Sequence, residues 1–420
     1  MIINRAVLFI GYYTSATVIK SVYTNYIDLD SDIKSKIKEE EITNLAQELI
    51  KIPSDETAGE KEVCEYLESF LKSLGMKVRL QEVLPNRPNI IAEVIGDGVG
   101  KSIMFNGHVD TVPIGDINKW SMDPYSAIIK DNKLFGRGST DMKGSIASMI
   151  IAMKFIMNNV KKFNGKIIFT GVMAEETTGL GTQKIVEENI KADMAVVGEP
   201  SDEKIYRAHK GTMWFNLFTY GKLEHSSESN SESNNAIINM MKLIMEINEI
   251  SKELETVENN LVGHPSINVG LIDGGTKQNM IADSCRISID RRTLPEEKTD
   301  EILDKLRIRL DRLRSLDGRL TFDLKIDTIR EAVEVAESEQ IVQEVKNALN
   351  KVIDKNPIIS GMKATTDMSI LVNQGNIPSV IYGPGFIKQA HTVDEFIEVR
   401  RLVESSQVYT EILLNILTNN

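Results

Sequence analysis

Residues 102–113 read SIMFNGHVDTVP, an apolar segment that runs into a glycine, a histidine and an aspartate. Its first four residues predict a short buried strand of an α/β sheet. Ligands bind at the carboxyl ends of such strands, and His108 and Asp110 can share one face there because they stand two residues apart. A metal-bound imidazole usually donates its second N–H to a carboxylate, a role that suits Asp110. Taken alone, this pair is better explained as an ordinary polar strand end.

Two acidic clusters have the same placement. Glu175 and Glu176 follow the apolar segment 166–173, and Glu199 follows the apolar segment 194–197. Carboxylates at the end of a buried strand are costly to desolvate unless a cation lies near them. Neighbouring side chains diverge, so one of the paired glutamates can bind metal while the other acts as a general base. The alternative is a solvated acidic loop, which is common for paired glutamates.

Asp141 and His391 complete the set. Asp141 lies in the glycine-rich stretch 136–144, GRGSTDMKG, directly before an apolar helix predicted over 145–157. The glycines indicate tight turns near a site, although an aspartate at this place also caps helices. His391 follows the apolar segment 379–382 and a Gly-Pro-Gly loop. Such a histidine, considered by itself, would be structural.

Five side chains are therefore candidate metal ligands, because parallel strands bring such ends together at one sheet edge: His108, Asp141, Glu176, Glu199 and His391. Two imidazoles and three carboxylates suffice for two metal ions if one carboxylate bridges them. Each ion then keeps an open position for water. Nitrogen and oxygen ligands without thiolate favour zinc, cobalt or manganese.

Composition narrows the class of protein. The chain has 420 residues and a net charge of −12, which disfavours nucleic acid and anionic lipid as partners. Only two cysteines are present, Cys64 and Cys285, as expected for a reducing, cytoplasmic environment. The apolar stretch 6–19 is interrupted by polar residues and is too short to span a membrane. We interpret residues 1–36 as an N-terminal extension of unknown role.

Two architectures alternate along the chain. Helices and short apolar strands over 37–206 and 331–420 predict an α/β catalytic domain in two parts, with helices on both faces of its sheet. Residues 207–330 instead give the order strand, helix, strand, strand, helix, strand, which is the ferredoxin-like pattern of an α+β domain. We therefore predict a discontinuous catalytic domain with an inserted ferredoxin-like lid.

Five motifs, in order, resemble those of the dinuclear-zinc metallopeptidase family that includes acetylornithine deacetylase, succinyl-diaminopimelate desuccinylase, aminoacylase and carboxypeptidase G. They are GHVDTVP (107–113), GRGSTDMKG (136–144), AEETTGLGT (174–182), VGEPS (197–201) and AHTVDEF (390–396). The resemblance implies a zinc-peptidase-like catalytic domain with a mixed sheet and a dimer-forming lid. It also implies that Asp141 bridges two metals, completed by His108 with Glu199 and by Glu176 with His391. Glu175 is then the general base and Asp110 the partner of His108.

The resemblance extends to residues outside these motifs. His225 is similar to a lid histidine that reaches the oxyanion across a dimer, although Glu224 replaces a small residue and the usual following proline is missing. The alternative is an exposed loop histidine. Arg292 matches an arginine that binds the substrate carboxylate, and an exposed strand face with ion pairs explains it nearly as well. Three further substrate contacts are implied: Asn279, Gly383 and Gly385.

The leading functional hypothesis is a metal-dependent amidohydrolase that releases the acyl group of an N-acyl amino acid, acting as a cytoplasmic homodimer. A dipeptidase or carboxypeptidase on the same centre is the alternative within enzymes. A catalytically silent metal-binding homologue is the alternative outside them, and the retention of Glu175 and all five ligands speaks against it.

Overall fold

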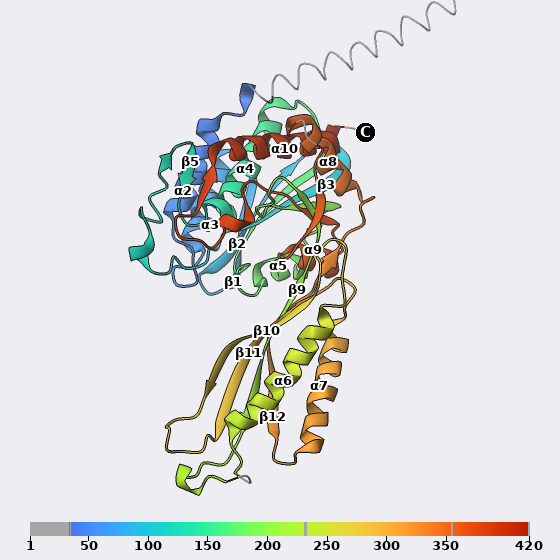
Figure 1. Ribbon diagram of the computed structural model, residues 1–420. Helices are drawn as coiled ribbons and strands as arrows, with labels where there is room; N and C mark the ends of the chain where they lie inside the picture. The colour runs from blue at the N-terminus through green and yellow to red at the C-terminus, as the bar shows by residue number, and fades with distance from the viewer. Residues whose placement is uncertain (1–32, 34, 231–232, 354–355, 419–420) are drawn as a thin grey trace, which may run out of the picture.

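The computed structural model describes residues 33, 35–230, 233–353 and 356–418 (Figure 1). The predicted extension, 1–36, therefore lies outside the described residues except for Ile33, Ser35 and Lys36. The described part forms a body built on a large sheet and a narrower lobe that projects from it (Figure 1). No helix in the described ranges is long and apolar enough to cross a membrane.

The large sheet has nine strands and mixed direction. Four central strands run parallel, in the order β6 (Asn164–Val172), β3 (Gly98–His108), β7 (Met194–Val197) and β15 (Ser379–Ile381). On one side β2 (Arg87–Ile95) and β1 (Lys77–Leu84) continue the sheet with antiparallel pairing. On the other side lie β8 (Ile205–His209), β13 (Val333–Glu334) and β14 (Ile359–Met362). The predicted α/β class, with a mixed sheet flanked by helices, is confirmed.

Helices lie on both sides of this sheet (Figure 1). On one side the apolar helix α4 (Gly144–Asn159) packs along α10 (Val399–Thr418), with α2 (Glu39–Lys51) and α8 (Gln340–Ile353) beside them. On the other side α5 (Leu180–Glu187) packs against α9 (Met368–Asn373), and α3 (Lys61–Ser73) contacts β1 and β2. Helix α4 is buried nearly all round, as its sequence predicts, because apolar residues occupy every face.

A short strand precedes the C-terminal helix. Residues 396–398 form a strand, β16 (Phe396–Glu398), which pairs with β5 (Lys133–Phe135) and, through it, with β4 (Ile129–Lys130). Helix α10 begins only at Val399. The pairing with β5, which is remote in sequence, overrides the local helical pattern at this point.

The lobe is a four-stranded antiparallel sheet with both of its helices on one face. Its order is β10 (Ser266–Gly274), β11 (Ser284–Thr293), β9 (Gly211–Tyr220) and β12 (Thr321–Arg330). Helix α6 (Ala236–Leu254) packs on three of these strands and against α7 (Thr299–Leu316), around a separate apolar core. This order of strands and helices is the ferredoxin-like one.

The chain passes between the two sheets twice. It leaves the large sheet after β8, at Lys210. It returns directly after Arg330, the last residue of β12. Lys210 and Arg330 therefore mark the junction between lobe and body.

Candidate metal centre

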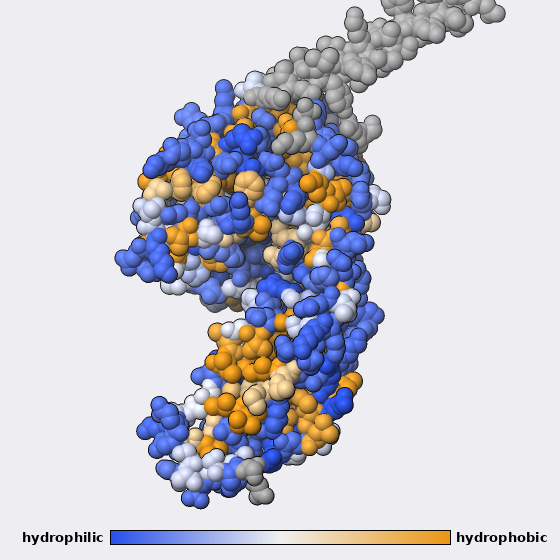
Figure 2. All heavy atoms as spheres, viewed as in Figure 1, coloured by the Kyte–Doolittle hydropathy of each residue, from blue (hydrophilic) through white to orange (hydrophobic). Residues whose placement is uncertain are grey.

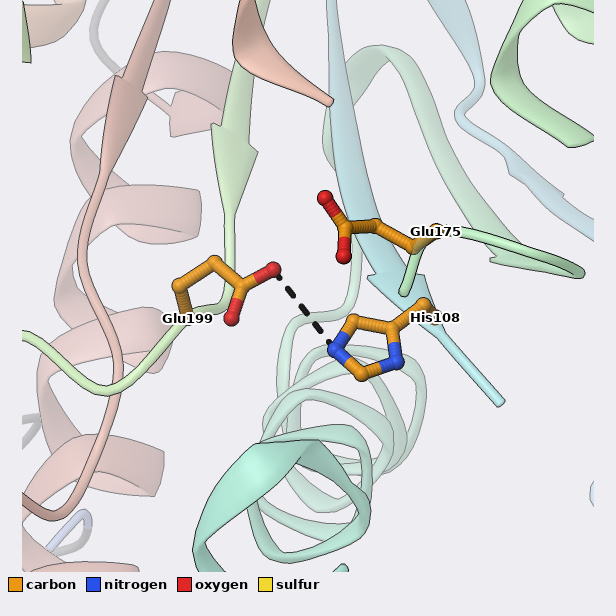
Figure 3. Close-up of side chains that lie close together, drawn as sticks. All are labelled: His108, Glu175 and Glu199. Carbon is orange, nitrogen blue, oxygen red and sulfur yellow. Dashed lines mark ion pairs between the residues drawn. The ribbon is translucent and has the colours of Figure 1, made fainter. Parts of the chain in front are cut away.

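The carboxyl ends of the central parallel strands gather polar side chains at one edge of the large sheet. His108 is the last residue of β3, and Glu175 and Glu176 lie in the loop that follows β6. Glu199 follows β7. Figure 3 shows His108, Glu175 and Glu199 converging from these three strand ends, with His108 Nε2 3.6 Å from Glu199 Oε1. The three residues were predicted to lie at one edge of the sheet, and in the structure their side chains lie close together.

Asp141 lies between two imidazoles. It belongs to an irregular turn, η2 (Ser139–Lys143), that leads into α4, and its peptide bond to Met142 is cis. Its Oδ1 is 2.9 Å from Nε2 of His108, and its Oδ2 is 3.3 Å from Nε2 of His391. One carboxylate thus directs each of its two oxygens at a different histidine, which is the arrangement expected of a bridging ligand.

His391 comes from the loop before β16 and has a left-handed backbone, with φ of 62°. Its Nε2 is 3.0 Å from Oε2 of Glu176. Each imidazole therefore has one carboxylate of its own, Glu199 for His108 and Glu176 for His391, in addition to the shared Asp141. The side chain of His391 is half exposed, whereas that of His108 is buried, so the two halves differ in their access to solvent.

Asp110 contacts His108 differently from the expected way. The ring Nδ1 of His108 bonds the main-chain oxygen of Asp110 at 2.9 Å, and the Asp110 carboxylate is 3.7 Å away. That carboxylate instead accepts the backbone N–H groups of Glu175 and Glu176, each at 3.1 Å. Asp110 therefore holds the imidazole through its backbone and the loop that carries both glutamates through its side chain.

The electrostatics of the cluster favour bound cations. Burial raises the pKa of Glu199 and raises that of Glu176 to about 7, and neighbouring Asp141 adds to both. Burial also opposes ionisation of Asp141, but the two imidazoles outweigh it and lower its pKa. Hydrogen bonds to Asp141 and Glu176 raise the pKa of His391 to about 10, and Glu199 and Asp141 raise that of His108 despite its burial.

Buried carboxylates this close together need nearby positive charge to balance their own. The ligand atoms of His108, Asp141 and Glu176 lie within 4.8 Å of one another, and so do those of His108, Glu175 and Glu199. Nitrogen and oxygen donors at such spacing fit two divalent cations. Glu175 is close enough to compete for a ligand position, so its assignment as a base needs a separate argument.

Glu395 anchors the turn that carries Asp141. Its Oε1 accepts the backbone N–H groups of Thr140 at 2.8 Å and Asp141 at 3.2 Å. Its Oε2 accepts from Arg137 Nη1 at 2.6 Å and from the N–H of Gly138 at 3.1 Å. The sequence analysis assigned no role to Glu395. Its only signal was its place in the motif that contains His391.

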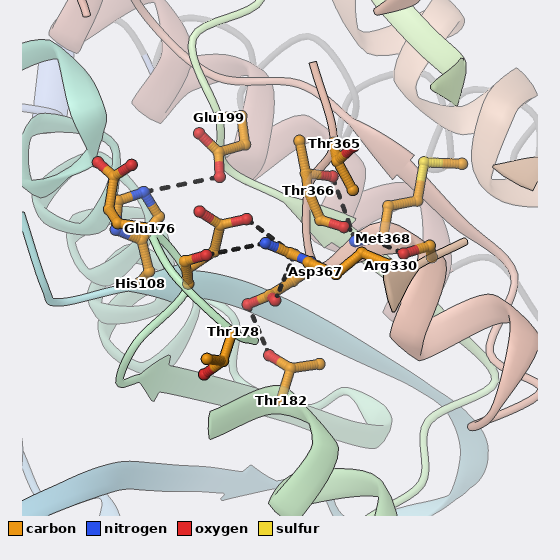
Figure 4. A network of polar contacts seen from close by, with 12 residues as sticks. His108, Glu176, Thr178, Thr182, Glu199, Arg330, Thr365, Thr366, Asp367 and Met368 are labelled. Carbon is orange, nitrogen blue, oxygen red and sulfur yellow. Dashed lines mark hydrogen bonds and ion pairs between the residues drawn. The ribbon is translucent and has the colours of Figure 1, made fainter. Parts of the chain in front are cut away.

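A second buried network lies behind Glu175. Arg330 donates to Glu175 and to Asp367, and Asp367 accepts from Thr182 (Figure 4). Arg330 closes a lobe strand and Asp367 precedes α9, so only the folded chain brings them to the metal centre. Neither residue was predicted.

The two glycines predicted to contact substrate lie against this edge. A Cβ on Gly383 would stand 2.2 Å from the carbonyl oxygen of Gly198 and 2.7 Å from that of Glu199. Gly385 has φ of 93°, and a Cβ there would approach Thr140. Only glycine therefore lets the loop after β15 pack closely on the strand end that carries Glu199.

The other three predicted residues lie in the lobe. His225 is exposed, and its Nδ1 is 2.8 Å from Ser227 Oγ. Asn279 accepts a main-chain hydrogen bond from Ser226. Arg292 bonds Asp290 at 2.9 Å and Thr212 at 2.7 Å. In the described part of the chain, none of the hydrogen bonds or ion pairs of these three residues reaches the five candidate ligands.

Comparison with known sequences identifies one protein family and several relatives that match over most of this chain. Residues 104–415 match the family described as Peptidase family M20/M25/M40. A probable succinyl-diaminopimelate desuccinylase of Staphylococcus epidermidis is 27% identical, over 90% of this chain and 98% of that protein. An N-formyl-4-amino-5-aminomethyl-2-methylpyrimidine deformylase of Bacillus subtilis is 28% identical, over 91% and 96%. An acetylornithine deacetylase of Pasteurella multocida is 30% identical, over 83% and 89%.

Solved structures share the fold. An M20 family metallo-carboxypeptidase of Sulfolobus solfataricus superposes with a TM-score of 0.75 at 20% identity, over 89% of this chain and 98% of that one. A structure from Bacillus subtilis, described as a dinuclear metal binding peptidase of the M20 family, gives a TM-score of 0.67 at 15% identity, over 91% and 99%. Human carnosine dipeptidase 1 gives 0.73 at 17% identity, over 92% and 98%.

Proposed function

The chain is a metal-dependent hydrolase that belongs to Peptidase family M20/M25/M40, and from this premise we propose that it hydrolyses the amide bond of an N-acyl amino acid. Family membership confirms the resemblance seen in the five motifs. The three sequence relatives described above are named as a desuccinylase, a deformylase and a deacetylase. All three names describe removal of an acyl group, and this is why we place an acyl amide ahead of a peptide.

The observation that carries the proposal is the position of Asp141 between His108 and His391, one oxygen toward each. We propose that these residues would hold two divalent ions, with His108 and Glu199 serving one site, Glu176 and His391 the other, and Asp141 both. The donor set supports zinc first, with cobalt or manganese as alternatives.

Glu175 is our candidate for the general base. Its neighbour Glu176 pairs with His391, whereas Glu175 pairs through Oε1 with the guanidinium of Arg330. A carboxylate that is already paired with an arginine is a weaker metal ligand than one that lies beside another candidate ligand, as Glu176 lies beside His391. Glu175 is therefore the glutamate that remains available for proton transfer.

Two divalent ions held there would polarise the amide carbonyl and lower the pKa of water at the site. Glu175 would accept a proton from the attacking water and deliver it to the leaving amine. The net reaction consumes one water and yields a carboxylate and an amine. His108 is kept in one orientation by the Asp110 carbonyl, so its Nε2 stays directed at Asp141.

Recognition of the substrate is assigned to residues of both lobe and body. Arg292, held by Asp290 and Thr212, would bind the substrate carboxylate. Asn279, Gly383 and Gly385 are proposed as further contacts. A dipeptidase or carboxypeptidase on the same centre is the competing function, and a silent homologue would require the loss of a ligand or of Glu175.

A substrate panel tests this proposal. We expect metal-loaded protein, with zinc, cobalt or manganese added, to hydrolyse N-acetylornithine or N-succinyl-diaminopimelate faster than simple dipeptides. Glu175→Gln should lower kcat by about 10²–10⁴-fold while both metals stay bound, because only proton transfer is removed. The surface variant Glu187→Gln is the matched control. Faster turnover of dipeptides would replace the acyl-amide assignment, and an unaffected Glu175→Gln enzyme would refute the base.

We also propose a homodimer formed through the lobe. Strand β10 is an edge of the lobe sheet, and its Leu271 and Ile272 are 65% and 61% exposed. Ile238, Met241 and Met245 add an exposed apolar stripe on α6. Figure 2 shows hydrophobic surface gathered over the lobe, where β10, β11 and α6 lie. Such a patch favours association.

A dimer would also give His225 access to an active site, since within one chain it contacts only lobe residues. Ile272→Asp should convert the dimer to a monomer in sedimentation velocity and lower activity together with it. A fully active monomer would exclude a role for His225 across the interface. A cytoplasmic location is part of the same proposal, and the free, buried thiols of Cys64 and Cys285 support it.

A further inference from the structure

Arg330 stands at the point where the lobe meets the metal centre. It is the last residue of β12 and lies opposite Thr212 of β9 in the register of the lobe sheet. Only 8% of its surface is exposed. On the other side of β9, the residue of β11 that lies opposite Thr212 is Arg292. Side chains directly opposite one another share a face of the sheet, so Arg330 lies on the same face of the lobe sheet as Arg292, the proposed substrate-binding arginine.

The guanidinium of Arg330 donates two hydrogen bonds to Glu175. Its Nη1 donates to the main-chain oxygen of Glu175 at 2.8 Å, and its Nη2 donates to Oε1 at 2.9 Å. The contacts fix both the backbone and the side chain of one residue. Arg330 uses only Oε1, which leaves the second carboxylate oxygen for the reaction. The planar, rigid fork of arginine suits this double contact, and the point charge of lysine does not.

Arg330 is itself held in place. Its Nη2 also donates to Asp367 Oδ1 at 3.1 Å, and Asp367 Oδ2 accepts from Thr182 Oγ1 at 2.7 Å (Figure 4). A Cβ on Gly179 would lie 3.4 Å from both Arg330 Nε and Asp367 Oδ1, so the loop after Glu175 closes over the pair. The guanidinium is therefore held by two residues of the body, Glu175 and Asp367, although Arg330 itself belongs to a strand of the lobe.

We infer that Arg330 is a positioning residue, which orients the carboxylate of Glu175 toward the metal centre and ties that orientation to the lobe through β12. The inference rests on the proposed role of Glu175 as general base. Because β12 pairs with β9 along its length, a rotation of the lobe moves the guanidinium, and the carboxylate with it. The orientation of the base thus depends on the orientation of the domain that binds the substrate.

Arg207 provides a matched control. It also lies at the junction, and its Nη1 likewise bonds one carboxylate, that of Glu334 at 2.8 Å, and one main-chain oxygen, that of Val335 at 2.7 Å. It makes no contact of this kind with Glu175. Replacing Arg207 therefore removes a comparable set of bonds from the same region and leaves the base untouched.

The test measures kcat and KM separately, with the best substrate of the panel. Arg330→Gln should lower kcat by about 10²-fold, because a misplaced base costs this much even when it is present. KM and metal content should stay unchanged. Arg330→Lys should recover only part of the loss, and added guanidinium should restore kcat in Arg330→Ala. Arg207→Gln and Arg207→Ala should keep the wild-type kcat, with no response to guanidinium.

A second measurement needs no substrate. In urea unfolding of the metal-free protein, Arg330→Gln should shift the midpoint less in a Glu175→Gln background than in the wild type, because the bond is already weakened there. Equal shifts in the two backgrounds would overturn the direct coupling. A rise in KM with kcat unchanged would make Arg330 a substrate-binding residue and overturn the inference, with the proposed function intact. An active Glu175→Gln enzyme would instead remove the proposed base itself.

Discussion

The edge of the large sheet and the helices of the lobe both carry many charges, but they hold them in opposite ways. At the sheet edge, Arg137 and Glu395 form an ion pair with side chains only 3% and 0% exposed. On the lobe, Arg309 of α7 bridges Glu246 and Glu253 of α6, and the side chains of Arg309 and Glu253 are 29% and 63% exposed. Water surrounds the charges of the lobe, whereas the buried charges at the sheet edge depend on partners within the protein.

Because of this difference, removing a charge destabilises the protein much more at the sheet edge than on the lobe. Loss of one member of a buried pair leaves an uncompensated charge in a region without solvent, and the cost is several kilocalories per mole. Loss of an exposed partner returns the other side chain to water at little cost. Four substitutions test this contrast between the two regions.

Asp141→Asn should have the largest effect. The amide cannot hold two cations at once, so we expect loss of both metals and a fall in activity of more than about 10⁴-fold. Metal content by mass spectrometry and the panel assay measure the two effects. Asp304→Asn, an exposed aspartate of α7, is the control and should bind metal normally. Full metal content in Asp141→Asn would contradict the bridging assignment.

Glu395→Gln should be next. It leaves Arg137 buried without a counter-charge and weakens the bonds to the backbone around Asp141, so the free energy of unfolding should fall by about 3–5 kcal/mol. Urea unfolding of the metal-free protein gives this value. A loss below about 1 kcal/mol would place this pair in the same class as the lobe pairs.

His209 should make stability depend on pH. Burial lowers the pKa of His209 from 6.5 to about 4, and its Nδ1 bonds the Lys210 carbonyl. The unfolded chain therefore takes up a proton first as the pH falls, and the native state loses about 3 kcal/mol between pH 6.5 and 4.

Unfolding curves across this range check the sign and size. His209→Asn should remove that part of the pH dependence, whatever it does to stability at pH 7. His264→Asn, an exposed lobe histidine, should leave the profile unchanged. Equal slopes in wild type and His209→Asn would show that other groups control the acid response.

Arg309→Met should have the smallest effect. Its partners Glu246 and Glu253 remain in contact with water, so the loss should not exceed about 1 kcal/mol. Thermal and urea unfolding measure it. A loss similar to that of Glu395→Gln would end the distinction between the two regions.

Much of the fold and of the candidate site can be predicted from hydrophobic periodicity and from the polar residues at the ends of apolar strands. The apolar run before His108 and the one before Glu199 predicted parallel strands that end at one sheet edge, and the structure, in which these strands pair, confirms the α/β class. Strand β1 was missed because only one of its residues is buried and no apolar run marks it, and β14 because it is short. Both depend on a neighbour for their structure.

The polar side chains at the ends of the apolar strands follow from local sequence, since hydrophobicity and chain order are local properties. The folded chain is needed to show that Asp141 directs one oxygen at each imidazole, and that Arg330, Asp367 and Glu395 support this edge. Those three come from a lobe strand, a helix start and a late loop, and no local pattern records their distance from the centre. Contacts between remote segments arise from packing, which fixes them only when the whole chain has folded.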